Sequence, residues 1–291
     1  MTMEKHLTMA APKRALGKLL KRVRKVFNVE HANGKKRTLA EFQAEVAAFE
    51  DWRVHNPSAT VKAFYAERKK TQIASGAAQS TFGTDLKSGR SFETSGVSAF
   101  QDLVAFGLRP SDTCVDYGCG TLRIGQHIIK YLGPGKYWGF DIADWVLEDG
   151  KSLIGSEVVA DKNPQLRVIS REAVLQAAAC KPAMLFSAKV MQHVHTDELA
   201  EYFDNIMTII GTSGQAIIIT KWSDGDTVRY RVNGWAHSIA IIRDLVTRLG
   251  GKMEILKEGV QPLPLEGAGS AKKGTIRIVH QASARANGPV R

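Results

Sequence analysis

Residues Thr113 to Gly125 have the sequence TCVDYGCGTLRIG, which gives the strongest indication of the fold. A short run of β-forming residues reaches an acid, Asp116, and glycines follow at alternate positions, Gly118 and Gly120. Glycines placed after a buried strand and before a helix let the backbone approach a ligand closely, and they expose the amide groups of the helix N-terminus. The stretch therefore predicts a strand–loop–helix unit with a ligand at its loop.

Outward from this stretch, strand and helix patterns alternate to the end of the chain. The strand patterns cover residues 113–118, 136–142, 165–170, 183–188 and 215–220, with a terminal pair at 252–259 and 274–281. The helical patterns cover residues 97–108, 123–132, 145–155, 171–179, 196–210 and 235–250. Short apolar strands separated by helices are typical of βαβ units. The prediction is an α/β fold with a mostly parallel sheet and helices on both faces.

The N-terminal third has a different character. Residues 1–72 are expected to form a basic helical arm, with Thr38 as the N-cap of one helix and Glu41 as its capping-box partner. Residues 73–98 are rich in Gly, Ser and Thr and predict a loop or lid. We expect the main domain to span 99–282 and a flexible tail to span 283–291.

Charge is concentrated in the arm. The chain of 291 residues has a net charge of +11, and residues 1–40 contain eleven Lys and Arg against two Glu. Residues 13–37 combine these cations with an apolar helical stripe. Three interpretations stay open: the arm binds an anionic membrane surface, binds nucleic acid, or packs over the main domain. The sequence contains no transmembrane segment or signal-peptide core, and its three cysteines lack metal or disulfide spacing, so a cytoplasmic protein is expected, with a peripheral position at the inner face of a membrane as an alternative.

A second acid follows the next strand pattern. Asp141 stands 21 residues after Gly120, where an acid at the end of the second strand of such a unit accepts hydrogen bonds from ribose hydroxyls. The alternative is a helix cap, which Asp144 could equally supply. A carboxylate at Asp116 would repel a pyrophosphate, but it suits a ligand with a cationic group.

These motifs resemble those of the class I S-adenosylmethionine-dependent methyltransferases, whose first motif is acid-x-G-x-G-x-G. VDYGCGTLRIG is similar to that motif, GFDI to the second, and AMLFSAKVMQHV to the segment around the fourth strand. The resemblance covers Phe100 to His280. It implies a seven-stranded Rossmann-like methyltransferase sheet, here with an N-terminal helical extension, and S-adenosylmethionine as the cofactor.

The resemblance also implies which residues meet the cofactor. The implied residues are Asp116, Gly118, Cys119, Gly120, Arg123, Asp141, Ile142, Glu172 and Ser187. Leu122 departs from the pattern because it replaces the third glycine. Arg123 beside it is expected to meet the cofactor carboxylate or an acid in the loop, with a solvated arginine as the alternative. Adenine recognition is open among Ser170, Arg171 and Glu172.

Acceptor chemistry is expected after the fourth and fifth strands. His193 is the candidate general base, with structural packing as the alternative, and His195 is expected at the surface. The candidate acceptor-binding residues are Lys189, Trp222, Tyr230, Trp235 and His237. Their aromatic and basic character suits sugar stacking or an anionic acceptor, although an ordinary packed loop would look the same. No metal site is expected.

The favoured function is O-methylation of a small-molecule or glycan hydroxyl. Two alternatives stay open. One is an RNA methyltransferase that uses the basic arm to hold phosphates, and the other is a non-catalytic protein that binds S-adenosylmethionine or serves as a scaffold.

Overall fold

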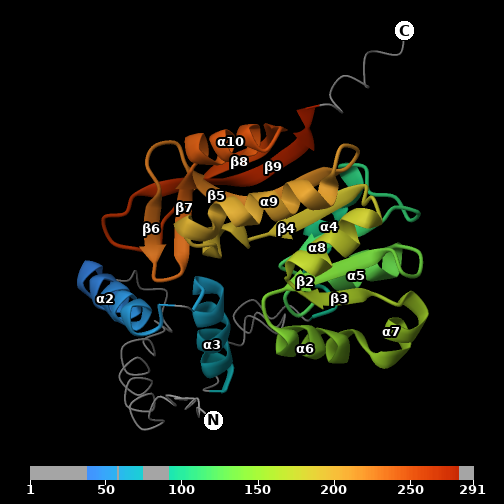
Figure 1. Cartoon of the computed structure of the whole chain (residues 1–291), viewed down its shortest axis with the longest axis horizontal. Coiled ribbons are helices and arrows are strands. Elements are labelled where there is room, and N and C mark those ends of the chain that lie inside the picture. Colours follow the sequence, from blue (N-terminus) through green and yellow to red (C-terminus); the bar gives the residue numbers. More distant parts are fainter. Residues whose placement is uncertain (1–37, 58, 75–91, 282–291) are drawn as a thin grey trace, which may run out of the picture.

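The computed structural model describes residues 38–57, 59–74 and 92–281 (Figure 1). Its helices are α2 (Leu39–His55), α3 (Val61–Ala74), α4 (Val97–Ala105), α5 (Gly125–Tyr131), α6 (Asp144–Ile154), α7 (Ser156–Lys162), α8 (Arg171–Ala179), α9 (Leu199–Ile210) and α10 (Ile239–Arg248), with the 3₁₀ helices η2 (Met191–His193) and η3 (Thr196–Glu198). Its strands are β1 (Cys114–Tyr117), β2 (Tyr137–Asp141), β3 (Gln165–Val168), β4 (Met184–Ala188), β5 (Gln215–Ser223), β6 (Val228–Arg231), β7 (Gly234–Ser238), β8 (Gly251–Pro262) and β9 (Ser270–His280).

Seven of these strands form the expected core sheet. Strands β3, β2, β1, β4 and β5 lie side by side in that order and are parallel. Strand β9 then pairs antiparallel with β5, and β8 pairs antiparallel with β9. The chain reverses its direction of travel between β1 and β4. In sheets of this kind, ligands bind outside the carboxyl ends of the strands at that reversal.

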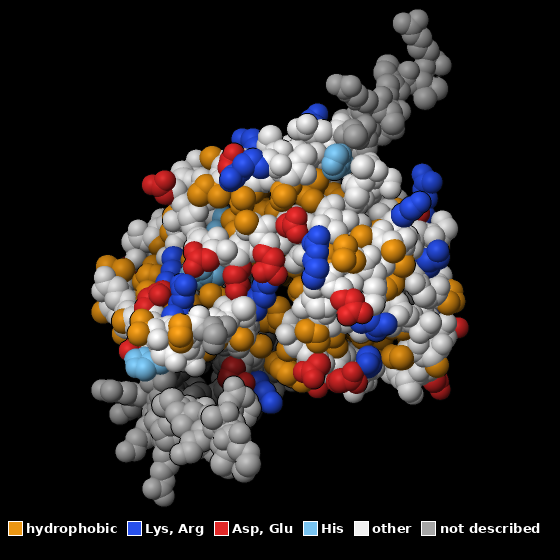
Figure 2. Space-filling model, viewed as in Figure 1, with side chains coloured by type: hydrophobic (Ala, Val, Ile, Leu, Met, Phe, Trp, Pro, Cys, Tyr) orange, Lys and Arg blue, Asp and Glu red, His pale blue; other side chains and the backbone are white. Residues whose placement is uncertain are grey.

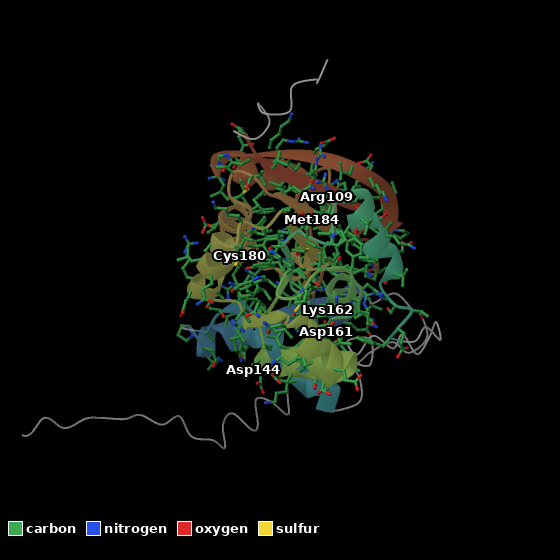
Figure 3. The ribbon with its side chains drawn as sticks, turned by 90° about the vertical axis from the view of Figure 1, so that its right-hand side faces the viewer. Arg109, Asp144, Asp161, Lys162, Cys180 and Met184 are labelled. Carbon is green, nitrogen blue, oxygen red and sulfur yellow. The ribbon has the colours of Figure 1, made fainter. Side chains whose placement is uncertain are left out.

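Helices cover both faces of the sheet, as expected. Along β4, Leu185 packs with α8, α9 and α10 on one face, whereas Met184 and Phe186 pack with α4, α5 and α6 on the other. This alternation follows from the two-residue repeat of a strand. Figure 3, a side view, separates Met184, at the start of β4, from Asp144, at the start of α6. The site therefore has to be sought at the end of the sheet where α6 begins.

The structure adds a hairpin that the sequence patterns did not predict. Strands β6 and β7 are antiparallel, and β7 pairs with the end of β5, where Trp222 stands opposite His237. The helix expected from residue 235 begins only at Ile239, so that prediction is wrong for its first turn. The reason is burial, because every residue of β7 is buried and the segment gains a strand partner on each side. The helix predicted at 145–155 ends at Ile154 as α6, but the short helix α7, which follows the break at Gly155 with φ of 88°, was not predicted.

The helices α2 and α3 pack against this hairpin and against η3. The capping box at the start of α2 is confirmed, since Thr38 and Glu41 bond to each other's backbone amides. Phe49 of α2 and Phe64 of α3 share a small apolar cluster with Val232. The lid predicted at 73–98 overlaps the end of α3 and the start of α4, while residues 75–91 lie outside the described part of the chain. So do the basic segment 13–37 and the tail 283–291.

The described surface carries both signs of charge. Figure 2 shows Lys and Arg interspersed with Asp and Glu over the face in view. Among the described helices, none is both long enough and apolar enough to span a membrane.

Candidate active site

A cavity of about 300 Å³ lies at the carboxyl ends of β1, β2 and β4. Its floor includes the loop after β1, its sides include the start of α6 and the segment after β4, and α3 closes it from the other side. Figure 2 shows hydrophobic side chains where the surface is hollowed between α3 and α6. This is the position predicted from the strand order, and small-molecule sites in proteins start at about this volume.

The glycine loop brings bare backbone to the cavity. Gly118 has φ of 85° and Gly120 has φ of 57°, a left-handed region that residues with side chains enter at a cost. A Cβ on Gly118 would stand only 2.2 Å from Val190 Cγ2. A Cβ on Gly120 would meet nothing within 4 Å, and Gly120 lines the cavity. One glycine therefore permits close packing against the segment after β4, and the other leaves open space for a ligand.

Asp141 lies at the end of β2, on the cavity wall. Its Oδ2 accepts a hydrogen bond from the Gly120 amide at 2.9 Å, and its Oδ1 accepts one from the Ile142 amide at 2.8 Å. It is not the cap of α6, whose N-cap position is Ala143 and makes no side-chain bond. The carboxylate instead ties the glycine loop to the second strand.

Asp116 is buried at the bottom of the cavity, with 3% of its surface exposed. The Tyr137 hydroxyl donates a hydrogen bond to Asp116 Oδ2 at 2.9 Å. Burial raises the pKa of Asp116 to about 7, against the lowering effect of that hydrogen bond and of the nearby Arg123. Arg123 also lines the cavity and donates to Ser95 Oγ at 3.2 Å, so it is not merely a solvated side chain. A cationic ligand group beside Asp116 would favour the ionised carboxylate.

Leu122, which stands where the motif has its third glycine, adopts a backbone conformation that favours glycine. Its φ is 62°, so a leucine holds a left-handed backbone that costs about 1–2 kcal/mol. Its side chain is completely buried. Two glycines make room for it, because a Cβ on Gly150 would stand 2.9 Å from Leu122 Cγ and a Cβ on Gly125 would stand 3.1 Å from Leu122 Cδ2. Burial of the leucine offsets the backbone strain.

His193 ends η2 and lines the same cavity. Its Nδ1 lies 2.7 Å from the carbonyl oxygen of Asn233, in the turn between β6 and β7. That contact requires a proton on Nδ1, so the neutral ring has its lone pair on Nε2. The amide nitrogen of Gln192 lies 3.1 Å from Nε2. The unexpected hairpin therefore sets the tautomer and orientation of the candidate base.

The helix α3 is held over the cavity by the segment after His193. Glu198 accepts hydrogen bonds from the backbone amides of Val61 and Lys62 at the start of α3, and Lys62 pairs with Glu201 at 2.6 Å. His195, expected at the surface, is buried with 7% exposed because Phe49 and Trp235 pack against its ring. It is a packing residue between α2 and the hairpin.

Several predicted site residues lie away from the cavity. Ser187 is buried beneath it, where its hydroxyl donates to the Tyr117 carbonyl oxygen and accepts from the Tyr202 hydroxyl. Glu172 is exposed on α8. The aromatic residues predicted to bind the acceptor are almost completely buried and do not line the cavity: Trp222, Tyr230, Trp235 and His237. They form the packed support of the hairpin, whereas Lys189 does line the cavity.

Other cavity residues were missed from the sequence. Trp145 and Val146 at the start of α6, with Ile169 after β3, give the wall beside Asp141 an apolar character. The sequence signal that could have identified them is their position just beyond the ends of predicted strands. Val61 and Ala66 come from α3, and no sequence signal singled out these two residues.

Comparisons with solved structures identify the fold. No protein-family model matches the sequence, and no curated protein matches it. Among solved structures, magnesium protoporphyrin IX methyltransferase (ChlM) from Synechocystis PCC 6803 with bound SAM is similar at a TM-score of 0.51 and 16% identity, over 77% of this chain and 99% of that one.

Two further structures are less similar. The 1,6-didemethyltoxoflavin-N1-methyltransferase of Burkholderia thailandensis has a TM-score of 0.48 at 14% identity, over 77% of this chain and 90% of that one. Geranyl diphosphate C-methyltransferase from Streptomyces coelicolor A3(2) has a TM-score of 0.47 at 16% identity, over 63% and 77%. The first of the three shows the shared fold, and the strand order and the glycine loop are consistent with it. This chain has the fold of the class I S-adenosylmethionine-dependent methyltransferases.

Proposed function

We propose that this protein is an S-adenosylmethionine-dependent methyltransferase that methylates a hydroxyl group of a small molecule or a saccharide. The observation that carries the proposal is a single cavity lined by a glycine loop, by an acid on each side of it and by a histidine of fixed tautomer: Gly118, Gly120, Asp116, Asp141 and His193.

The cavity residues fit this cofactor. Gly120 leaves open space beside Asp141, whose two oxygens are held by backbone amides in the position proposed for ribose recognition. The apolar wall of Trp145, Val146 and Ile169 suits a purine ring. Asp116 suits a cationic ligand group, and Arg123 suits a carboxylate. When bound, S-adenosylmethionine supplies an electrophilic methyl group.

His193 is proposed to remove the proton of the acceptor hydroxyl. A general base acts best when its lone pair is held in one orientation, and the Asn233 carbonyl oxygen does this from the Nδ1 side. Alignment of acceptor and methyl group contributes much of the rate of such an in-line displacement. The helix α3, which closes the cavity, favours a small acceptor group over a base within folded RNA.

The test is transfer of an isotope-labelled methyl group into a cell extract, followed by mass spectrometry of the products. Wild-type protein is expected to label a defined product, and His193→Ala is expected to reduce the rate by about 100-fold or more, as for loss of a general base. His127→Ala is the matched control, because His127 bonds to the Ser95 carbonyl oxygen away from the cavity. Unchanged labelling by His193→Ala would remove His193 from the mechanism, and absence of any labelled product would count against a catalytic role.

A further inference from the structure

A second, smaller cavity adjoins the first. It has a volume of about 140 Å³ and is lined by Lys189, Gln192, Ile219, Thr220, Lys221, Gln261 and Lys273. Lys189 lines both cavities. Gln192, on the wall of the smaller one, contacts the Nε2 atom of His193, on the wall of the larger one. A ligand in the smaller cavity is therefore a close neighbour of the candidate base.

The smaller cavity concentrates positive charge. Three of its seven lining residues are lysines, and none is acidic. Lys221 of β5 and Lys273 of β9 stand directly opposite each other in the antiparallel register. Like charges at such a position destabilise a sheet. The opposed positions of these two lysines therefore lower the stability of the fold.

Two other lysines of this part of the sheet, on β9 and β8, are paired with carboxylates. Lys272 pairs with Glu258 at 3.2 Å, and Lys257 pairs with Asp102 at 2.6 Å. Within the described residues, no carboxylate pairs with Lys221 or Lys273. Burial and the nearby cations Arg231, Lys273 and Lys189 all lower the pKa of Lys221. A bound anion would relieve this repulsion.

The cavity also offers a hydrogen-bond acceptor. The Oε1 atom of Gln261 is buried and has no partner within the described residues. A buried acceptor without a partner costs about 1–3 kcal/mol, which a ligand hydroxyl would recover. The backbone of Lys189, immediately after β4, is strained, with φ of 61° in the left-handed region. Such strain persists where the surrounding structure enforces it and is frequent at ligand sites.

We propose that the methyl acceptor carries an oxyanion, a carboxylate or a phosphate, next to a hydroxyl group, and that this oxyanion binds between Lys189, Lys221 and Lys273. The inference rests on the proposed function, since it names the class of acceptor for that site. The bound oxyanion anchors the acceptor on the side of His193 away from the glycine loop. Gln261 Oε1 accepts a hydrogen bond from the acceptor hydroxyl that neighbours the oxyanion. Gln192 lies between the bound oxyanion and the candidate base His193.

The test uses full-length protein and inorganic phosphate as the probe. Thermal unfolding is followed as phosphate replaces chloride at constant ionic strength, with acetate as a second series for a carboxylate. Phosphate or acetate is expected to raise the unfolding temperature of the wild type. Lys273→Gln is expected to bind the probe about tenfold more weakly, the loss of one charge-assisted hydrogen bond.

The matched control is Lys272→Gln, which removes the same charge from the next residue but leaves the cavity intact. It is expected to keep the full response to the probe. Lys273→Gln should also unfold at a higher temperature than the wild type when no probe is present, because it relieves the repulsion of Lys221. A stabilised variant with a lost response cannot be a misfolded one. An equal response in both variants, or none in the wild type, would overturn the inference.

Binding of S-adenosylmethionine, measured by calorimetry on the same samples, separates the two proposals. Absence of a probe response in the wild type, with intact cofactor binding, would overturn only the oxyanion site. Absence of cofactor binding with an intact probe response would overturn the methyltransferase proposal and leave an anion site.

Discussion

The two halves of the candidate site are built by different means. The half that contains the glycine loop consists of consecutive residues, and Gly118 and Gly120 take left-handed backbone angles within five residues of the end of β1. The half that contains His193 depends on distant segments, because a carbonyl oxygen of Asn233, 40 residues away, orients its ring. Local chain geometry makes the first half, and tertiary packing makes the second.

The largest effect is expected from a substitution that disrupts the contact between the two halves. Gly118→Ala places a methyl group 2.2 Å from Val190 Cγ2 and forces an alanine to adopt φ of 85°. Backbone strain of about 1–2 kcal/mol and overpacking of about 1–3 kcal/mol should lower the free energy of unfolding by about 2–5 kcal/mol. Chemical denaturation measures this loss, and calorimetry should show S-adenosylmethionine binding weakened by about 100-fold, as for a displaced binding loop.

The double variant Gly118→Ala/Val190→Ala separates the two causes. It should recover the overpacking part of the loss but not the part due to φ. Gly259→Ala is the control, because its Cβ would meet nothing within 4 Å and its φ is not positive. If Gly118→Ala is as stable as Gly259→Ala, the close approach between the halves is not real.

The same contrast explains how much could be predicted from the sequence. Asp116, Gly118, Gly120 and Asp141 lie at the cavity as expected, since strand ends and glycine spacing are local features. The hairpin could not be predicted in this way. Trp235 and its neighbours have an aromatic and basic pattern that fits an exposed binding loop equally well. Only the pairing of β7 with β5 and the packing of α2 against it decide that they are buried.

The change of folding stability with pH should have opposite signs in the two halves of the site. In the glycine-loop half, burial raises the pKa of Asp116 to about 7, so the folded state holds a proton that the unfolded state has lost. Stability due to Asp116 falls as the pH rises from about 4 to 7. In the other half, burial lowers the pKa of His237 to about 4. Stability due to His237 is therefore lost as the pH falls from about 6.5 to 4.

Each group should contribute on the order of 3 kcal/mol across its window, because one pKa unit corresponds to about 1.4 kcal/mol. The measurement is the free energy of unfolding between pH 4.5 and 7 for wild type, Asp116→Asn and His237→Gln. Relative to the wild type, Asp116→Asn should gain stability as the pH rises, and His237→Gln should gain it as the pH falls. Parallel curves for the three proteins would contradict the assigned burial.

A smaller effect is expected within the half that contains the glycine loop. Leu122→Gly removes a buried side chain at a cost of about 3 kcal/mol and recovers about 1 kcal/mol of backbone strain. Gly150→Ala forces a methyl group to within 2.9 Å of Leu122 Cγ. The double variant should be more stable than the sum of the single losses by about 1–2 kcal/mol, because alanine then occupies vacated space. Purely additive losses would mean that Gly150 does not make room for Leu122.

The most direct test of the central claim is calorimetric titration of S-adenosylmethionine into wild type, Asp141→Ala and Asp144→Ala. Asp141 holds the amides of Gly120 and Ile142 and is the proposed ribose acceptor, whereas Asp144 is an exposed acid whose Oδ1 accepts a hydrogen bond from the amide of its neighbour Trp145. We expect binding by the wild type, equal binding by Asp144→Ala, and a loss of about 100-fold in Asp141→Ala, as for two lost charge-assisted hydrogen bonds. Absence of binding by the wild type, or equal binding by the two variants, would contradict the proposed cofactor site.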